Sequence, residues 1–266
     1  MRSQTQITAY VGAFPGGRPA PNLELVPVST DSNFTFIFCL AFARDLNRDG
    51  NFTPVWDSQI TPGYISQLME ENPNRKFYAS LGGGDNFPWQ APADEGAWIN
   101  NAVSSLTNMM STYSLAGFDI DYENNLDDSF VRCMSQVITQ MVEHSQWSCA
   151  PFGATNIQYQ QLWTSTNFFL GCYNYQAYAD GIDDIQGYED ALASVGNLLT
   201  VNGVTYGTIG LGIASSTQSP RGLQLPDLLT VWESVHASGV TSAAIWCLED
   251  SAENNYAIES AIQANS

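Results

Sequence analysis

Short runs of apolar residues recur along the whole chain, and these runs are rich in β-branched and aromatic side chains. They are nearly continuous rather than alternating, which is typical of parallel strands that are buried on both faces. The pattern predicts eight strands, at 7–14, 34–43, 76–82, 116–122, 146–152, 169–178, 207–214 and 241–248.

Helical patterns lie between these runs. Residues 127–143 open with two acids, which are favourable at the start of a helix, and their apolar residues fall on one face. The segment 15–33 is rich in proline and glycine, so we expect a brief helix there or none. The predicted helices are 59–72, 94–112, 127–143, 157–166, 187–200, 226–238 and 252–264.

Strand and helix alternate about eight times, an order that predicts parallel strands joined by right-handed crossovers. The length of 266 residues suits one α/β barrel, which takes up about 250 residues. No Gly-x-Gly-x-x-Gly turn follows the first strand, which disfavours a dinucleotide-binding sheet. No linker or low-complexity tract divides the chain. We therefore predict an α/β fold, a single (β/α)8 TIM barrel over residues 1–266.

The charge balance excludes some classes of partner. The chain has 27 Asp and Glu against 8 Lys and Arg, a formal net charge of −19. Such a surface disfavours nucleic acid and anionic membranes, and no run reaches the roughly 18 apolar residues of a membrane helix. The first residues lack the apolar core of a signal peptide. We expect either a cytosolic or storage location, or a secreted or vacuolar protein whose leader has been trimmed.

The five cysteines are an odd number, so at least one thiol is free or pairs between chains. Four of them lie within apolar, strand-like runs, which favours buried small hydrophobic residues. No Cys or His spacing suggests zinc, and we expect no metal and no other cofactor.

Three acidic residues, Asp119, Asp121 and Glu123, end the fourth predicted strand. Side chains alternate along a strand, so these three point to one side, and Ile120 and Tyr122 point to the other. The helix-facing side must be apolar, so the acids face the barrel axis, at the strand ends where such barrels hold active sites. Carboxylates this close cannot all ionise, and a general acid needs a retained proton. The alternatives are a solvated charge cluster and a metal cage, although neither histidine lies at a strand end.

In this region the sequence resembles the glycoside hydrolase family 18 proteins. Their signature, Asp-x-x-Asp-x-Asp-x-Glu, aligns with Ala116-Gly-Phe-Asp119-Ile-Asp121-Tyr-Glu123. Their Ser-x-Gly-Gly motif appears as Ser80-Leu-Gly82-Gly83, and the Gln-x-Tyr of the plant chitinases as Gln176-Ala-Tyr178. The resemblance covers all eight predicted strands. It implies a barrel similar to the compact plant-type chitinases and the narbonin-like seed proteins.

The resemblance also implies a mechanism in which the 2-acetamido oxygen of the substrate is the nucleophile. Glu123 would protonate the glycosidic oxygen and later activate water. Asp121 would hydrogen-bond the acetamido N–H and offset the charge of the oxazolinium intermediate, and Asp119 behind it would tune its protonation. Tyr178 would hydrogen-bond the acetamido carbonyl. Trp246 stands where the family has a tryptophan under the sugar ring.

Further residues are expected around this site. The motif of Gln176 implies a part in substrate binding. Tyr10 and Phe42, at the ends of the first two strands, either line the same pocket or pack in the core. Gly82 and Gly83 are expected to let the backbone approach the pocket closely.

One position departs from the family pattern, because the first Asp of the signature is Ala116 here. Three functions stay open. The first is a retaining hydrolase of β-1,4-linked N-acetylglucosamine polymers or oligosaccharides, and the second a storage protein or chitin-oligosaccharide lectin with weak turnover or none. The third is an endo-β-N-acetylglucosaminidase acting on N-glycans. Glu123 favours the first and third, whereas Ala116 and the acidic, Asn- and Gln-rich composition favour the second. We expect an N-acetylglucosamine-containing oligosaccharide or chitin as partner, and a monomer.

A second motif, over residues 45–52, resembles the first eight positions of a calcium loop. Acids or amides stand at positions 1, 3 and 5, and Gly50 stands at position 6. The acidic ligand of position 12 is missing, because Trp56 stands there. The alternative is a polar turn in the loop after the second strand.

Overall fold

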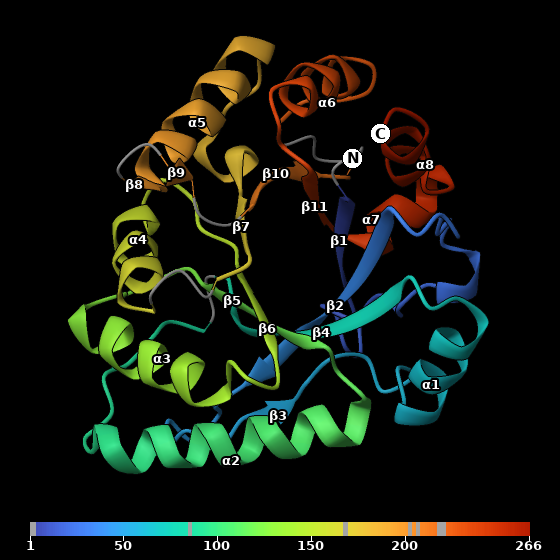
Figure 1. The fold of residues 1–266 in the computed structure, drawn as a ribbon. Coiled ribbons are helices and arrows are strands. Elements are labelled where there is room, and N and C mark those ends of the chain that lie inside the picture. Colours follow the sequence, from blue (N-terminus) through green and yellow to red (C-terminus); the bar gives the residue numbers. More distant parts are fainter. Residues whose placement is uncertain (1–3, 85–86, 167–169, 202–203, 206–207, 217–221) are drawn as a thin grey trace.

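The computed structural model describes residues 4–84, 87–166, 170–201, 204–205, 208–216 and 222–266. Parallel strands form a closed barrel in which β1 pairs with both β2 and β11, and helices ring the strands (Figure 1). The predicted (β/α)8 barrel is therefore confirmed. Its strands, in order around the barrel, are β1 (Thr5–Val11), β2 (Phe34–Arg44), β4 (Arg75–Gly83), β5 (Gly117–Tyr122), β6 (Gln146–Cys149), β7 (Cys172–Tyr175), β10 (Thr208–Ala214) and β11 (Ser242–Trp246).

Four barrel strands, β1, β6, β7 and β11, end before the apolar runs predicted for them. β1 ends at Val11, before Gly12 with its φ of 83°, and β11 ends at Trp246, because a short helix begins at Leu248. β6 ends at Cys149, two residues before Pro151, which has no N–H to offer a ladder. β7 ends at Tyr175, because the chain turns at once into the 3-10 helix η2 (Ala177–Asp180). Part of the predicted run 169–178 lies outside the described residues. The described part of the chain also contains three strands of two residues each, which no apolar run predicts: β3 (Thr53–Pro54), β8 (Thr200–Val201) and β9 (Val204–Thr205).

The outer helices begin where the sequence supplies caps. Asp94, Asp127 and Asp184 each accept a hydrogen bond from a backbone N–H of the first turn that follows. Part of the acidity of the chain thus satisfies helix N-termini. The helices are α1 (Pro62–Glu71), α2 (Glu95–Tyr113), α3 (Asp128–Met141), α4 (Asn156–Ser165), α5 (Ile185–Leu198), α6 (Asp227–Ala237), α7 (Leu248–Ser251) and α8 (Ala257–Ala264).

The last predicted helix, 252–264, is wrong in its first half. Asn255 and Tyr256 have φ angles of 52° and 56°, so the chain adopts a left-handed turn there, and α8 begins only at Ala257. The proline- and glycine-rich segment 15–33 contains only the 3-10 helix η1 (Leu23–Leu25), as expected.

Alternation along the strands divides the apolar residues into two cores. On β2, Phe36, Phe38 and Leu40 belong to the larger cluster, which also contains the buried faces of the helices. Ile37 and Cys39 belong to a smaller cluster inside the barrel. The interior core is small, so polar groups can occupy the barrel axis near the C-terminal ends of the strands. All five cysteines are buried and unpaired. Burial was predicted for the four in strand-like runs, and the odd number required at least one thiol without a partner in the chain.

Candidate active site

Strand β5 directs its two aspartates into the barrel. Phe118, Ile120 and Tyr122 pack in the outer core, so Asp119 and Asp121 point the opposite way, as the period of two predicts. Both are buried, with Asp119 at 0% and Asp121 at 3% exposure. Glu123 follows directly after the strand and is half-buried. The three acids therefore rise from the barrel interior to its mouth.

Hydroxyl groups surround the deepest of these acids. Asp119 pairs in register with Ser80 of β4 and with Ser148 of β6, so the three lie in one row. Ser148 donates to Oδ1 at 2.6 Å, and Ser80 donates to Oδ2 at 3.0 Å. Tyr10 of β1 also donates to Oδ2, at 3.0 Å. Burial raises the pKa of Asp119, and the hydrogen bonds from these hydroxyls lower it.

Asp121 has a different environment. Burial raises its pKa well above the ordinary value, and the negative charges of Glu123 and Asp119 raise it further. One hydrogen bond, from Gln176 Nε2 to Oδ1 at 3.1 Å, acts in the opposite direction. Of the two aspartates, Asp121 is the one whose environment most favours a retained proton.

Gln176 connects the acids to the next part of the site. Its Nε2 also lies 3.5 Å from Glu123 Oε1 and donates to the Ala150 carbonyl at 2.6 Å. Its Oε1 accepts a hydrogen bond from the Tyr178 hydroxyl at 2.8 Å. The amide is thus fixed in one orientation, with its donor toward the carboxylates and its acceptor toward the tyrosine.

Tyr178 lies on η2, and Asp180 of the same short helix ties that helix down. The Asp180 carboxylate accepts hydrogen bonds from the Gly153 backbone N–H and from the Tyr175 hydroxyl. A Cβ atom on Gly153 would lie 2.7 Å from Asp180 Oδ1, so a side chain there would disturb this contact. The loops after β6 and β7 therefore hold Tyr178 beside the acids.

A cleft of about 550 Å³ opens above these side chains. Trp246, at the end of β11, forms part of its wall and contacts other rings. Its ring centroid lies 5.7 Å from that of Tyr10 and 6.0 Å from that of Phe42, the latter nearly parallel at 23°. The cleft is lined by Phe14, Phe42, Gly84, Asp121, Glu123, Gln176, Tyr178, Ala179, Ala214, Ser216, Trp246 and Asp250.

The cleft differs from the sequence prediction in some positions. Tyr10 is not among its lining residues, because its ring is buried below and its hydroxyl serves Asp119. Gly82 and Gly83 both have φ near 101°, and a Cβ on either would lie 2.9 Å from an aromatic ring, that of Tyr122 or Phe42. They let strand β4 end close to those rings, as a glycine permits.

Gly84 is the glycine that lines the cleft, and a Cβ there would lie 3.2 Å from Glu123 Oε2. The sequence reasoning missed it, although the run of three glycines that ends β4 was a visible signal. It also missed Phe14, which lies in the loop after β1, and Asp250, which lies on the four-residue helix α7; both segments are too short to show a periodicity.

Ala116 lies just before β5, at the lower end of the barrel. It is half-buried, packs against the interior core and donates its backbone N–H to the Phe77 carbonyl at 2.8 Å. Asp119 has hydroxyl donors on both neighbouring strands, Ser80 and Ser148, and a third, Tyr10, across the barrel interior, so its oxygens need no partner at position 116. These three hydroxyls offer a physical substitute for the missing acid.

The loop at 45–52 is built around Asp45 rather than around an open cation site. Asp45 Oδ1 accepts the Asp49 N–H at 3.0 Å, and Oδ2 accepts the Gly50 N–H at 2.9 Å. Oδ2 also accepts the Trp98 Nε1–H at 2.7 Å. Among the described residues, no three His, Cys, Asp or Glu side chains are grouped to hold a metal ion. This geometry favours the polar turn over the calcium loop.

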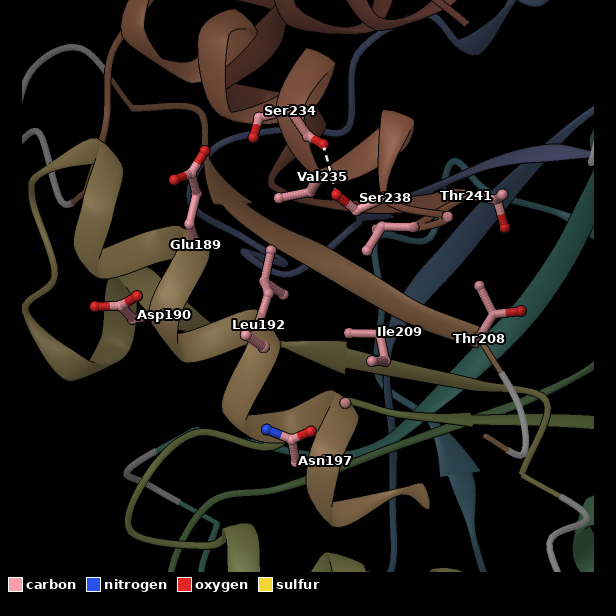
Figure 2. A pocket seen from close by; sticks show the side chains of 14 residues that line it. Glu189, Asp190, Leu192, Asn197, Thr208, Ile209, Ser234, Val235, Ser238 and Thr241 are labelled. Atoms are coloured by element: carbon pink, nitrogen blue, oxygen red, sulfur yellow. Dashed lines mark hydrogen bonds between the residues drawn. The ribbon is translucent and has the colours of Figure 1, made fainter. Parts of the chain in front are cut away.

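A larger groove, of about 650 Å³, lies between α5 and α6 (Figure 2). Thr208 begins β10 and Thr241 directly precedes β11, so this groove is at the N-terminal ends of the strands. Glu189 and Asp190 flank it on the α5 side. Active sites of such barrels lie at the opposite end, so we assign the chemistry to the cleft at Glu123. Within the described part of the chain, no helix has the length and apolar character to span a membrane.

Comparisons with known proteins find chains of similar sequence and structure, although no protein-family model matches. The sequence is 36% identical over 172 residues to Chitinase 1 of Tulipa saxatilis subsp. bakeri, covering 58% of this chain and 54% of that protein. It is 27% identical over 134 residues to RuBisCO-associated protein of Glycine max, covering 45% and 47%. The structure is similar to a family 18 chitinase from Crocus vernus, with TM-score 0.87 and 26% identity over 98% of each chain.

The two kinds of comparison differ in extent. The chain spans about half the length of the curated relatives it matches, whereas the structural match extends over nearly the whole of both barrels. The similarity therefore includes all strands that carry the site.

Proposed function

Because this chain is similar in sequence and in fold to family 18 chitinases, we propose that it is a retaining, substrate-assisted hydrolase of β-1,4-linked N-acetylglucosamine polymers or oligosaccharides. Its substrate is chitin or an N-acetylated oligosaccharide, bound in the cleft above Asp121 and Glu123. The proposal rests on the arrangement of the acids on and directly after β5, whose surroundings raise the pKa of Asp121 more strongly than that of Asp119.

The contrast between the two buried aspartates is the observation that carries the proposal. Hydroxyl donors stabilise the ionised form of Asp119, whereas burial between two acids favours the protonated form of Asp121. Positive charge that develops on the acetamido group next to Asp121 reduces the cost of ionising it. Asp121 is thus suited to stabilise an oxazolinium that the substrate forms from its own acetamido group.

Glu123 acts as general acid and then as general base. Its carboxylate lies at the cleft, where a glycosidic oxygen can reach it, and Gly84 leaves room beside it. Gln176 holds Asp121 and Glu123 through one amide nitrogen, and it presents its carbonyl oxygen to Tyr178. Tyr178 then hydrogen-bonds the acetamido carbonyl as it attacks, and Trp246 supports the sugar ring.

A binding protein without turnover is the second candidate. Ala116 favours it, since the family signature is incomplete at that position, and one relative carries the name RuBisCO-associated protein rather than that of an enzyme. The same cleft would then bind an N-acetylated oligosaccharide without cutting it.

The test is hydrolysis of N-acetylated chitooligosaccharides by the parent and by Glu123→Gln. We expect the variant to lose at least about 10²-fold in kcat, the low end for general acid catalysis, while oligosaccharide binding persists. Glu143→Gln is the matched control, because Glu143 is exposed, lies between α3 and β6 and does not line the cleft; this variant should retain full activity. Fully deacetylated oligomers should not be cut, because they lack the nucleophile.

The outcomes separate the candidates. Equal activity of parent and Glu123→Gln would overturn the assignment of the acid. A folded parent that binds the oligosaccharides and does not cut them would establish the lectin-like function instead. Cleavage of deacetylated oligomers would contradict substrate assistance.

A further inference from the structure

An aromatic side chain outside the family motifs lines the same cleft. Phe14 lies in the loop after β1, is half-buried, and contributes to the wall of the cleft next to Trp246. We propose that Phe14 is a second sugar-binding platform, which contacts the N-acetylglucosamine unit adjacent to the one on Trp246. This inference rests on the proposed function, since it names how a longer oligosaccharide extends through that cleft.

The orientation of the two rings supports separate platforms. The Phe14 and Trp246 ring centroids lie 6.2 Å apart, and the ring planes meet at 66°. Trp246 is covered on other sides by Tyr10 and Phe42, so it belongs to the fixed core of the barrel mouth. The Phe14 ring is edge-on to the Trp246 ring. A sugar unit on Trp246 would therefore have the Phe14 ring beside it, where the next unit of the oligosaccharide can contact that ring.

Arg18 holds the Phe14 ring from one side. The guanidinium carbon lies 4.5 Å from the Phe14 ring centroid, a cation–π contact. The same guanidinium pairs with Asp250 and lies 3.8 Å from Glu253 Oε1. Asp250 and Glu253 follow β11, so the clamp joins the loop after the first barrel strand to the segment after the last.

This clamp leaves a defined surface for a ligand. One face of Phe14 is occupied by Arg18, so the surface that lines the cleft is the remaining face and edge. An aromatic ring offers its face to the C–H groups of a sugar, and few convergent polar groups then fix the orientation. Asp250 lines the cleft beside the ring, and its carboxylate can accept a hydrogen bond from a sugar hydroxyl. The Phe14–Asp250 pair thus has the apolar and polar parts of a sugar subsite.

A core-packing role makes a different prediction. If Phe14 only filled space, its removal would weaken binding of all oligosaccharides equally or lower the melting temperature. A platform one unit away from Trp246 affects only chains long enough to reach it. The dependence on oligosaccharide length therefore separates the two roles.

The experiment measures calorimetric affinity for N-acetylglucosamine and for its N-acetylated trisaccharide in the Glu123→Gln background, where turnover is suppressed. Phe14→Ala should weaken trisaccharide binding by about tenfold, which is 1.4 kcal/mol, and alter binding of the single sugar much less. Phe14→Tyr should retain the parent affinities, because it keeps the ring. Arg18→Met, which removes the charge that positions the ring, should give a smaller loss with the same length dependence. Leu25→Ala, at a residue 68% exposed and outside the cleft, is the control.

Equal loss for both lengths, or no loss in Phe14→Ala, would overturn the platform. Phe14→Leu, which keeps the apolar volume, serves as the second variant should Phe14→Ala prove unstable, and it should show the same length-dependent loss. Failure of the proposed function looks different: a folded parent that binds the sugars and cuts none of them refutes the hydrolase but leaves the affinity ratio measurable. A protein that binds neither sugar would refute both.

Discussion

Replacing Ser148 by alanine tests whether the hydroxyls that donate to Asp119 keep its carboxylate ionised. Ser148 donates to Oδ1 at 2.6 Å, while Ser80 and Tyr10 both donate to Oδ2. Oδ2 thus has two hydroxyl donors, whereas Oδ1 has one. Loss of Ser80 leaves a hydroxyl on Oδ2, whereas loss of Ser148 removes the hydroxyl donor of Oδ1. Only the weaker thiol donor of Cys39 remains nearby.

The magnitude follows from the burial of the pair. A hydrogen bond to a charged group contributes about 1.5–3 kcal/mol, and both Asp119 and Ser148 are buried. One pKa unit corresponds to about 1.4 kcal/mol, so removing the bond should raise the pKa of Asp119 by about one to two units relative to the parent. The proposed role of Asp119 requires its negative charge. The acidic limb of the kcat/KM profile should therefore move to higher pH by the same amount.

The assay is a pH–rate profile on one N-acetylated oligosaccharide. Ser148→Thr keeps the hydroxyl and should retain the parent profile, and Ser80→Ala should shift it less than Ser148→Ala. Melting temperatures at each pH distinguish a shifted profile from partial unfolding. Identical profiles for Ser148→Ala and the parent would refute the reasoning, as would a larger shift for Ser80→Ala.

Two more predictions follow from buried carboxylates. The pKa of Asp121 is raised in the fold, so the native protein holds a proton that the unfolded chain loses near pH 3.8, and stability must fall as the pH rises from there toward the native pKa. Asp121→Asn should therefore increase the free energy of unfolding at pH 7, by up to about 4 kcal/mol if Asp121 stays protonated in the native parent. The variant should also lose the dependence of stability on pH that Asp121 causes. Thermal unfolding of parent and variant across pH measures both effects, and a variant less stable than the parent at pH 7 would contradict the prediction. Asp45→Ala removes the acceptor of two backbone N–H groups of the 45–52 turn and of the Trp98 indole N–H on α2, and it should lower stability by about 1–3 kcal/mol. Calcium should not change the melting temperature of the parent, and a calcium-dependent increase lost in Asp45→Ala would restore the calcium loop.

The strands of the barrel could be predicted because each is an apolar run that must be buried on both faces. The ends of β6 and β7 could not be placed the same way, since Pro151 and the turn into η2 interrupt runs that remain apolar beyond the last ladder bond. The two-residue strands β3, β8 and β9 contain too few residues to produce any periodicity.

The acids of the site could be predicted from their period of two, but their partners could not. Ser80 and Ser148 face Asp119 because of the register between adjacent strands, which the closed barrel fixes and a single strand does not. Tyr10 could be assigned to a strand end, although its bond to Asp119 spans the interior between strands that are not neighbours. Phe14 depends on a loop conformation, and Asp250 lies on the four-residue helix α7; the hydrophobic pattern predicts the direction of neither side chain.

Closure of the barrel through β1 has a consequence for the order in which the molecule is made. β1 occupies residues Thr5–Val11, but one of its two partners is β11, at Ser242–Trp246. A chain leaving the ribosome therefore carries an unpaired edge on β1 until β11 has been synthesised, and such edges can pair with other chains. The Tyr10–Trp246 ring contact and the Gly12–Glu249 hydrogen bond both span this same seam. The cleft is thus among the last parts of the protein to form, and nascent chains lack a complete site until the final strand docks.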